Sequence, residues 1–187
     1  MDGFPSMKFT DRALLELAVL ELITAATTLG FLYWRGWRQR EFRFDRNWRL
    51  TVAGVVLFVV AAAINVVYET LARGVIPGSE MLAQIVDTSI VSWPVVIVVS
   101  LVNGVYEEYF LTHYLVEAIA SHGVVFALGV SALVRVSYHF YQGPFGAIAV
   151  LLWCVVASVF YWRFRRVWPV IVAHVLTDAV ALGEMVK

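Results

Sequence analysis

Cysteine is almost absent from this chain of 187 residues, which contains only Cys154. A single cysteine excludes an internal disulfide and a structural zinc site built from several thiolates. Cys154 lies within an apolar segment, where an unpaired cysteine is typically a small buried hydrophobe. The fold therefore depends on non-covalent packing.

Charge is also scarce. Only 15% of the residues are charged, 61% are hydrophobic, and the mean hydropathy is +0.79. Soluble domains contain about 25% charged and about 45–50% apolar residues. The formal net charge is zero, which gives no indication of a nucleic-acid partner. This composition predicts an integral membrane protein that forms a single domain over residues 1–187.

Long apolar runs are abundant, and a membrane-spanning helix needs about 20 such residues. The predicted spans are 13–34, 50–73, 93–116, 123–141, 145–162 and 167–184. Residues 79–92 are less apolar and are predicted to form an interfacial helix. The predicted fold is an all-α polytopic membrane bundle of six or seven helices, of which six fit the charge pattern best.

Basic residues are concentrated in two segments. Six of the twelve arginines lie between Arg35 and Arg49, and three more lie within 163–166. Cytoplasmic loops of membrane proteins carry an excess of Lys and Arg. With six spans, loops 35–49 and 163–166 fall on the same side, which we predict to be the cytoplasmic side of the cell membrane. Membrane lipids are the expected neighbours, and loop 35–49 could also bind anionic lipid.

Several ionisable residues nevertheless fall inside the apolar segments. They are Glu107, Glu108, Arg135, His139, His174 and Asp178. One carboxylate at the centre of a membrane helix costs roughly 2.5–3.5 kcal/mol on insertion scales. Two adjacent ones indicate a functional site, and the most direct hypothesis is an intramembrane enzyme.

The spacing of these residues assigns them to helix faces. Arg135 and His139 are one turn apart, as are His174 and Asp178. Adjacent residues of a helix point about 100° apart, so Glu107 and its neighbour cannot share one role. A glutamate in this medium takes up a proton unless a cation or hydrogen-bond donors stabilise its charge. Arg135 is the strong base predicted to lie deep in a span.

These residues resemble the CPBP (ABI) family of intramembrane proteases, which includes the CAAX prenyl endopeptidases and bacterial immunity proteins. The family has the motifs Glu-Glu-x-x-x-Arg, Phe-x-x-x-His and His-x-x-x-Asn or Asp on separate helices. The corresponding segments here are 107–112, 135–139 and 174–178, within a core of about 90–182. Thr112 stands where the family has Arg, and Arg135 where it has Phe. We expect the Arg135 guanidinium to replace the missing one and to reach a glutamate of the first motif.

The resemblance implies glutamic-type peptide hydrolysis. Glu107 is then the general base on a water, helped by His139, while Glu108 is held by a cation. His174 and Asp178 take the place where the family stabilises the oxyanion, with Asp178 orienting the imidazole. The predicted topology puts His139 near the outer end of its helix, above Glu107. A tilt, or an inward dip of residues 140–146, is then needed to bring the two together.

Two other interpretations remain open from the sequence. A non-catalytic member could act as a bacteriocin-immunity or scaffold protein, which the Thr112 departure favours. A proton-coupled transporter would need an inverted repeat, and none is visible. The predicted enzyme needs no cofactor; the alternative is zinc held by two His and one or two Glu. The expected substrate is a membrane protein or a lipidated peptide, and the sequence predicts no oligomeric state.

Overall fold

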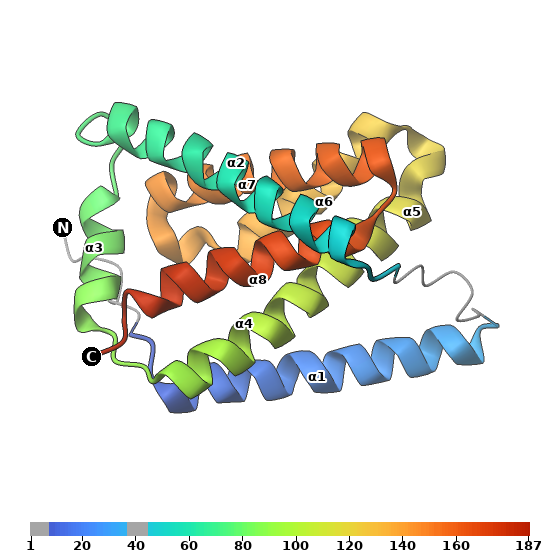
Figure 1. The fold of residues 1–187 in the computed structure, drawn as a ribbon, viewed down its shortest axis with the longest axis horizontal. Helices are drawn as coiled ribbons and strands as arrows, with labels where there is room; N and C mark the ends of the chain where they lie inside the picture. The colour runs from blue at the N-terminus through green and yellow to red at the C-terminus, as the bar shows by residue number, and fades with distance from the viewer. Residues whose placement is uncertain (1–7, 37–44) are drawn as a thin grey trace.

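The computed structural model describes residues 8–36 and 45–187, which form a bundle of helices (Figure 1). Within these ranges no strand is formed. In chain order the elements are α1 (Asp11–Trp34), α2 (Trp48–Ala72), α3 (Ser79–Thr88), α4 (Trp93–Glu107), the π-helix η2 (Glu108–Tyr114), α5 (Leu115–Ile119), the 3-10 turn η3 (Ala120–His122), α6 (Val124–Tyr138), the 3-10 turn η4 (Phe140–Gln142), α7 (Gly143–Phe164) and α8 (Val167–Gly183). The predicted all-α fold class is confirmed.

In the described part of the chain, four helical stretches are long and apolar enough to cross a membrane. They are Asp11–Trp34, Trp48–Ala72, Trp93–His122 and Phe140–Phe164. The apolar helices α6 and α8 have 15 and 17 residues, which corresponds to lengths of about 22 and 25 Å. All six coincide with predicted spans. The predicted span 123–141 is too long, because α6 ends at Tyr138 and a 3-10 turn follows.

Helices α1 and α2 are apolar on almost every side. Their exposed side chains include Leu20 at 60% and Val66 at 62% exposure. A helix with apolar residues all round belongs in a protein core or in a membrane, and these side chains are not in the core. The chain is therefore an integral membrane protein.

Local sequence signals set the helix boundaries. The side chains of Thr10 and Asn47 cap α1 and α2 by accepting hydrogen bonds from the backbone N–H groups of Ala13 and Leu50. Helices α4 and α7 carry proline in their first turn, where the missing N–H has no helical partner. The predicted segment 79–92 contains a helix, α3, which ends at Thr88; its interfacial position stays a prediction.

The first described residues and the C-terminus lie at one end of the bundle (Figure 1). There, Ile90 N–H donates to the carbonyl of Phe9, and Val91 N–H donates to that of Met185. At the opposite end, Arg166 pairs with Asp45. The described residues 45–49 and the segment 163–166 thus lie at the same end of the bundle. Residues 37–44 of the predicted loop 35–49 lie outside the described residues.

Helix α8 packs closely against both α2 and α4. A Cβ added at Gly54 of α2 would lie 2.6 Å from Cβ of Val172, and one added at Gly104 of α4 would lie 2.7 Å from Cγ2 of Val175. Small residues allow membrane helices to approach this closely. Gly104 precedes Glu107 by one turn, and Val175 follows His174, so this contact fixes the two helices that carry Glu107 and His174.

Candidate active site

Glu107 and Glu108 lie where α4 passes into the π-helix η2. Their exposed fractions are 5% and 0%. A π-helical turn is wider than an α-helical one and is frequent at functional sites. It places Glu108, Tyr109 and Thr112 all in buried positions. The sequence predicted one regular helical span here. The glutamate pair instead lies where the α-helix changes into the π-helix.

Glu108 is fully engaged by its neighbours. Its Oε1 accepts from Arg135 Nη1 at 2.8 Å and from His174 Nδ1 at 2.5 Å, while its Oε2 accepts from the Thr112 hydroxyl at 2.5 Å. These donors come from α6, α8 and η2. A charge-assisted network of this kind stabilises a buried carboxylate and fixes its orientation. Glu108 therefore ties three elements together.

Arg135 is buried to 2% exposure on α6. Besides Glu108, its guanidinium donates from Nη2 to the Thr112 hydroxyl at 3.2 Å and to the backbone carbonyl of Glu107 at 3.4 Å. Its Nε lies 3.4 Å from Oε2 of Glu107. The contact expected from the sequence, between the Arg135 guanidinium and the glutamate pair, is present. The Thr112 hydroxyl accepts from Arg135 and donates to Glu108, so it links these two side chains.

His174 and Asp178 share one face of α8, as their spacing predicted. His174 Nε2 lies 3.4 Å from Oδ1 of Asp178 and 4.0 Å from Oε2 of Glu107. The other carboxylate oxygen of Asp178 accepts from Asn103 Nδ2 at 2.8 Å. Asn103 was not predicted as a site residue. Its position one turn before Glu107 on the same helix is the signal that could have found it.

Glu107 contrasts with its neighbour because its Oε2 is buried and accepts no hydrogen bond. Two basic groups flank this oxygen, Arg135 Nε at 3.4 Å and His174 Nε2 at 4.0 Å. Tyr138 of α6 also interacts with this carboxylate. Such a carboxylate is held in place by charge and retains a free lone pair.

His139 lies at the C-terminal end of α6, as predicted. Its Nδ1 is 2.9 Å from the carbonyl of Arg135, so Nδ1 carries the proton and Nε2 of the neutral ring is an acceptor. The ring stacks on Tyr141, with centroids 6.0 Å apart. Among the described residues, no hydrogen bond or ion pair joins His139 to a carboxylate. The structure brings the other five predicted residues into one cluster and leaves His139 one turn beyond it.

Glu21 of α1 is a buried acidic residue for which no role could be predicted from the sequence. It is 7% exposed, and its Oε2 accepts no hydrogen bond. It is close enough to Glu107, Asp178 and His174 for electrostatic interaction with all three. The signal for its burial is the stripe Leu14, Ala18, Glu21 on one face of α1.

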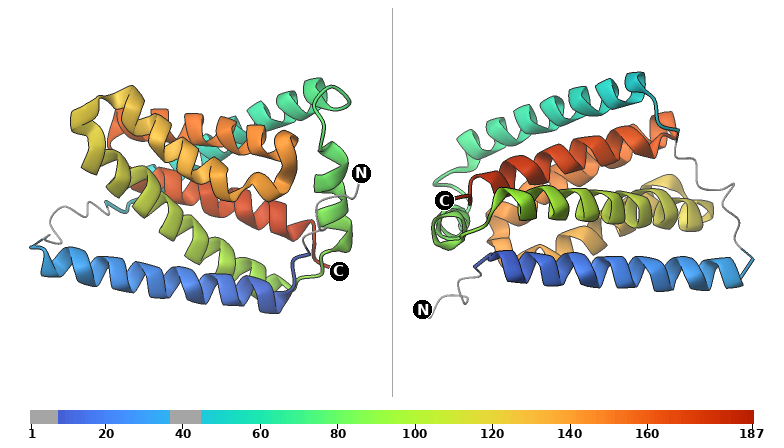
Figure 2. Two further views of the ribbon diagram at one scale, coloured as in Figure 1. Left: turned by 180° about the vertical axis from the view of Figure 1, so that it is seen from behind. Right: turned by 60° about the horizontal axis from the view of Figure 1, so that its bottom comes forward.

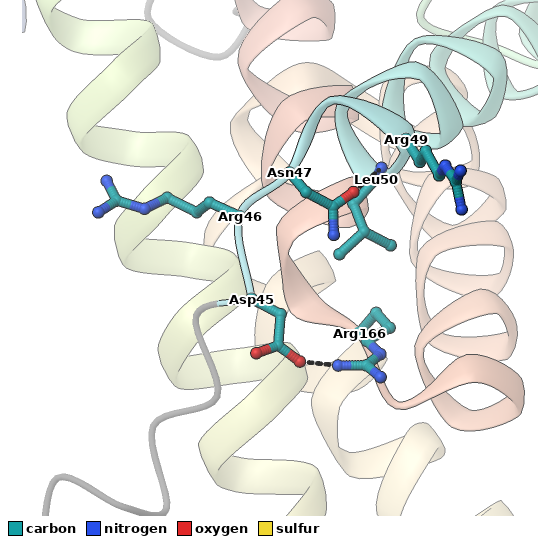
Figure 3. A pocket seen from close by; sticks show the side chains of 6 residues that line it. All are labelled: Asp45, Arg46, Asn47, Arg49, Leu50 and Arg166. Carbon is teal, nitrogen blue, oxygen red and sulfur yellow. Dashed lines mark hydrogen bonds and ion pairs between the residues drawn. The ribbon is translucent and has the colours of Figure 1, made fainter.

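An open pocket at the Arg-rich end is a separate feature (Figure 3). Its volume is about 520 Å³, and it is lined by Asp45, Arg46, Asn47, Arg49, Leu50 and Arg166. The side chains of Arg46 and Arg49 point in different directions, and Arg166 pairs with Asp45. None of the buried cluster lines this pocket, so it is not the candidate active site.

Metal binding was the alternative for the buried cluster. Within residues 8–36 and 45–187, no group of three or more His, Cys, Asp or Glu side chains is arranged to hold a metal ion. His174 instead places both ring nitrogens toward carboxylates. The cluster is an ion-paired network of carboxylates, a guanidinium and an imidazole.

The fold and this network define the class of the protein: a polytopic membrane protein with a carboxylate–arginine–histidine centre inside its helix bundle. Residues 89–180 match the model of the Rce1-like type II CAAX prenyl endopeptidases. The chain therefore belongs to the CAAX protease-like family of membrane proteases. No curated protein and no solved structure matched the chain in the corresponding comparisons.

Proposed function

We propose that this protein is an intramembrane endopeptidase that hydrolyses peptide bonds with a water activated by Glu107. The observation that carries the proposal is the difference between the adjacent glutamates. Oε2 of Glu107 is buried, flanked by two basic groups and without a hydrogen bond. Glu108 already accepts three hydrogen bonds. Oε2 of Glu107 is thus the carboxylate oxygen of this pair that no hydrogen bond occupies, and it can bind and deprotonate a water.

In the proposed reaction, Glu107 takes a proton from the water as its oxygen attacks the carbonyl carbon of the substrate. The carbonyl oxygen becomes a negatively charged oxyanion. Glu107 then returns the proton to the amide nitrogen, the C–N bond breaks, and a carboxylic acid and an amine leave. General-base catalysis of this kind contributes typically 10²–10⁴-fold.

His174 is the proposed oxyanion donor. Its Nδ1 is held at 2.5 Å by Glu108, whereas its Nε2 has only the longer contacts with Asp178 at 3.4 Å and Glu107 at 4.0 Å. The Nε2–H is therefore the group available to a developing oxyanion. Asp178, held in turn by Asn103, orients the ring and favours its protonated form.

Arg135 and Glu108 have the proposed role of holding the site together. The guanidinium reaches both glutamates and Thr112, so it fixes the general base relative to His174. The proposed part of His139 is to assist Glu107 through its Nε2, since Nδ1 is engaged by the Arg135 carbonyl.

The proposed reaction needs no metal or other cofactor, and the proposed substrate is a membrane protein or a lipidated peptide. The Arg-rich loops are proposed to be cytoplasmic, with the protein in the cell membrane. The rival function, an immunity or scaffold protein without catalysis, drew its support from Thr112. The Arg135 guanidinium in contact with Glu108 removes much of that support.

The test is incubation of the detergent-solubilised protein with a peptide library and identification of new termini by mass spectrometry. Wild type is compared with Glu107→Ala, and Glu69→Ala on the half-exposed part of α2 is the matched control. We expect cleavage by wild type and by the control, and none by Glu107→Ala. Equal product from all three would refute catalysis by Glu107, and no product from any would favour the non-catalytic role.

A further inference from the structure

Glu21 is a buried carboxylate that the proposed reaction does not use. It lies on the one face of α1 that is buried, together with the apolar Leu14, Ala18 and Leu32. Its Oε2 is shielded and accepts no hydrogen bond. The other acidic side chain in the middle of α1, that of Glu16, is 64% exposed and is paired with Arg12 at 2.7 Å. Glu21 has no such partner.

The charges around Glu21 do not balance. Four buried or half-buried acidic residues, Glu21, Glu107, Glu108 and Asp178, face two basic ones, Arg135 and His174. Both basic groups are already in contact with Glu108 or Asp178. A buried carboxylate without a partner takes up a proton rather than stay charged, and it ionises when a cation is brought to it. Among the described side chains, the basic group close enough to interact with Glu21 is His174, which is already in contact with Glu108 and Asp178.

The position of α1 indicates where a counter-charge would come from. This helix runs along one edge of the bundle, beside α4 (Figure 2). A substrate that entered from the bilayer at this edge would pass α1 before it reached the cluster. The side chains of lysine and arginine suit such a path, because an apolar stem carries the charged group.

We infer that Glu21 is a substrate-recognition residue that receives the cationic side chain of a lysine or arginine close to the scissile bond. This inference rests on the proposed peptidase function and names the substrate class of that same site. The ammonium or guanidinium group would donate hydrogen bonds to Oε2 of Glu21 and complete the charge balance of the cluster. Peptides with an uncharged residue at that position leave the carboxylate unpaired and are poorer substrates.

The first experiment measures kcat/KM on synthetic transmembrane peptides that differ at one position near the cleavage site, which is lysine, arginine, norleucine or glutamate. Wild type should prefer lysine to norleucine by about 10- to 100-fold, the range for a hydrogen bond to a charged group. Glu21→Gln should abolish this ratio, mainly through KM, and Glu16→Gln should keep it. Glu21→Lys should shift the preference toward glutamate.

The second experiment measures binding of the same fluorescently labelled peptides by anisotropy and so does not need turnover. Tighter binding of the lysine peptide by wild type, lost in Glu21→Gln, supports the inference. If the peptides bind in this way but none is cleaved, the peptidase proposal fails and the recognition role of Glu21 stands. Equal binding of lysine and norleucine peptides by wild type overturns the inference. So does a Glu21→Gln variant that lowers binding of every peptide by the same factor, since Glu21 would then have only a structural role.

Discussion

The buried cluster has two halves that differ in how completely their polar groups are satisfied. In the closed half, Glu108 accepts three hydrogen bonds from Arg135, Thr112 and His174. In the open half, Oε2 of Glu107 and Oε2 of Glu21 accept none. Two glutamates adjacent in sequence therefore belong to different halves.

This difference predicts which substitutions change the stability of the fold and which change catalysis alone. A buried network whose members are all satisfied makes the fold more rigid. A buried polar atom without a partner contributes nothing comparable and persists where a substrate or water completes it. Substitutions in the closed half should therefore change both folding and turnover, whereas substitutions in the open half should change turnover alone.

The largest effect is expected from Arg135→Ala. It leaves Glu108 without its cation in a dry bundle, and breaking a buried ion pair costs about 3–5 kcal/mol. Thermal unfolding in detergent should occur at a much lower temperature, and peptide cleavage should fall as far as in His174→Ala. The exposed Arg163→Ala is the control, and it should match wild type in both measurements.

The double change Arg135→Phe with Thr112→Arg restores the pattern of the family and should recover part of the activity lost in Arg135→Phe. Recovery would show that the guanidinium matters more than the helix that carries it. If Arg135→Ala keeps wild-type stability and turnover, the closed half has no structural role and the comparison fails.

Thr112→Val should have a smaller effect on the closed half. It removes one hydrogen bond to Glu108 and one acceptor for Arg135, which costs about 1.5–3 kcal/mol for hydrogen bonds to charged groups. Chemical or thermal unfolding should report this loss, with a moderate reduction in turnover. A variant as stable as wild type would mean that water replaces the hydroxyl and that the closed half is not dry.

Asn103→Ala should affect turnover more than stability. The change removes the hydrogen bond that fixes Asp178, so the Nε2 side of His174 loses its support while Glu108 still holds Nδ1. A loss of about 1 kcal/mol in positioning corresponds to somewhat less than tenfold in rate. The measurement is kcat on a cleaved peptide, with the melting temperature as control. Asn103→Asp, which adds a like charge, should be worse than Asn103→Ala; the reverse order would contradict an orienting role.

Chelation of metal ions is expected to have no effect on the rate of cleavage. Because the reaction is proposed to use a carboxylate-activated water, 1,10-phenanthroline should leave the rate of cleavage unchanged. A loss of activity that added zinc restores would show a metal at the site and would replace Glu107 as the group that activates the water.

Much of the fold could be predicted from the sequence because long apolar runs are a strong signal. Ranges such as 13–34 and 167–184 agree with α1 and α8 within two residues at each end. The contact of Arg135 with Glu108 could also be predicted, because a buried carboxylate needs a cation and Thr112 cannot supply one. The need of a buried carboxylate for a cation follows from its charge and burial, so it can be inferred without knowing how the helices pack.

Other features of the site depend on packing that the sequence does not display. The π-helix at Glu108 changes the direction of the side chains that follow, and no residue pattern marks it. Glu21 and Asn103 are single polar residues in apolar helices, so their roles depend on how each helix is rotated against its neighbours. The position of His139 depends on where α6 ends, and the sequence placed that end too late.

The central claim is that Glu107 acts in catalysis and Glu108 in holding the bundle together. It is tested most directly by measuring turnover and melting temperature together for Glu107→Gln and Glu108→Gln. Both should lose activity, Glu107→Gln by about 10²–10⁴-fold. Only Glu108→Gln should also melt at a clearly lower temperature. A Glu107→Gln variant that keeps more than about a tenth of wild-type turnover, well outside the usual general-base loss, or that melts as early as Glu108→Gln, would contradict the account.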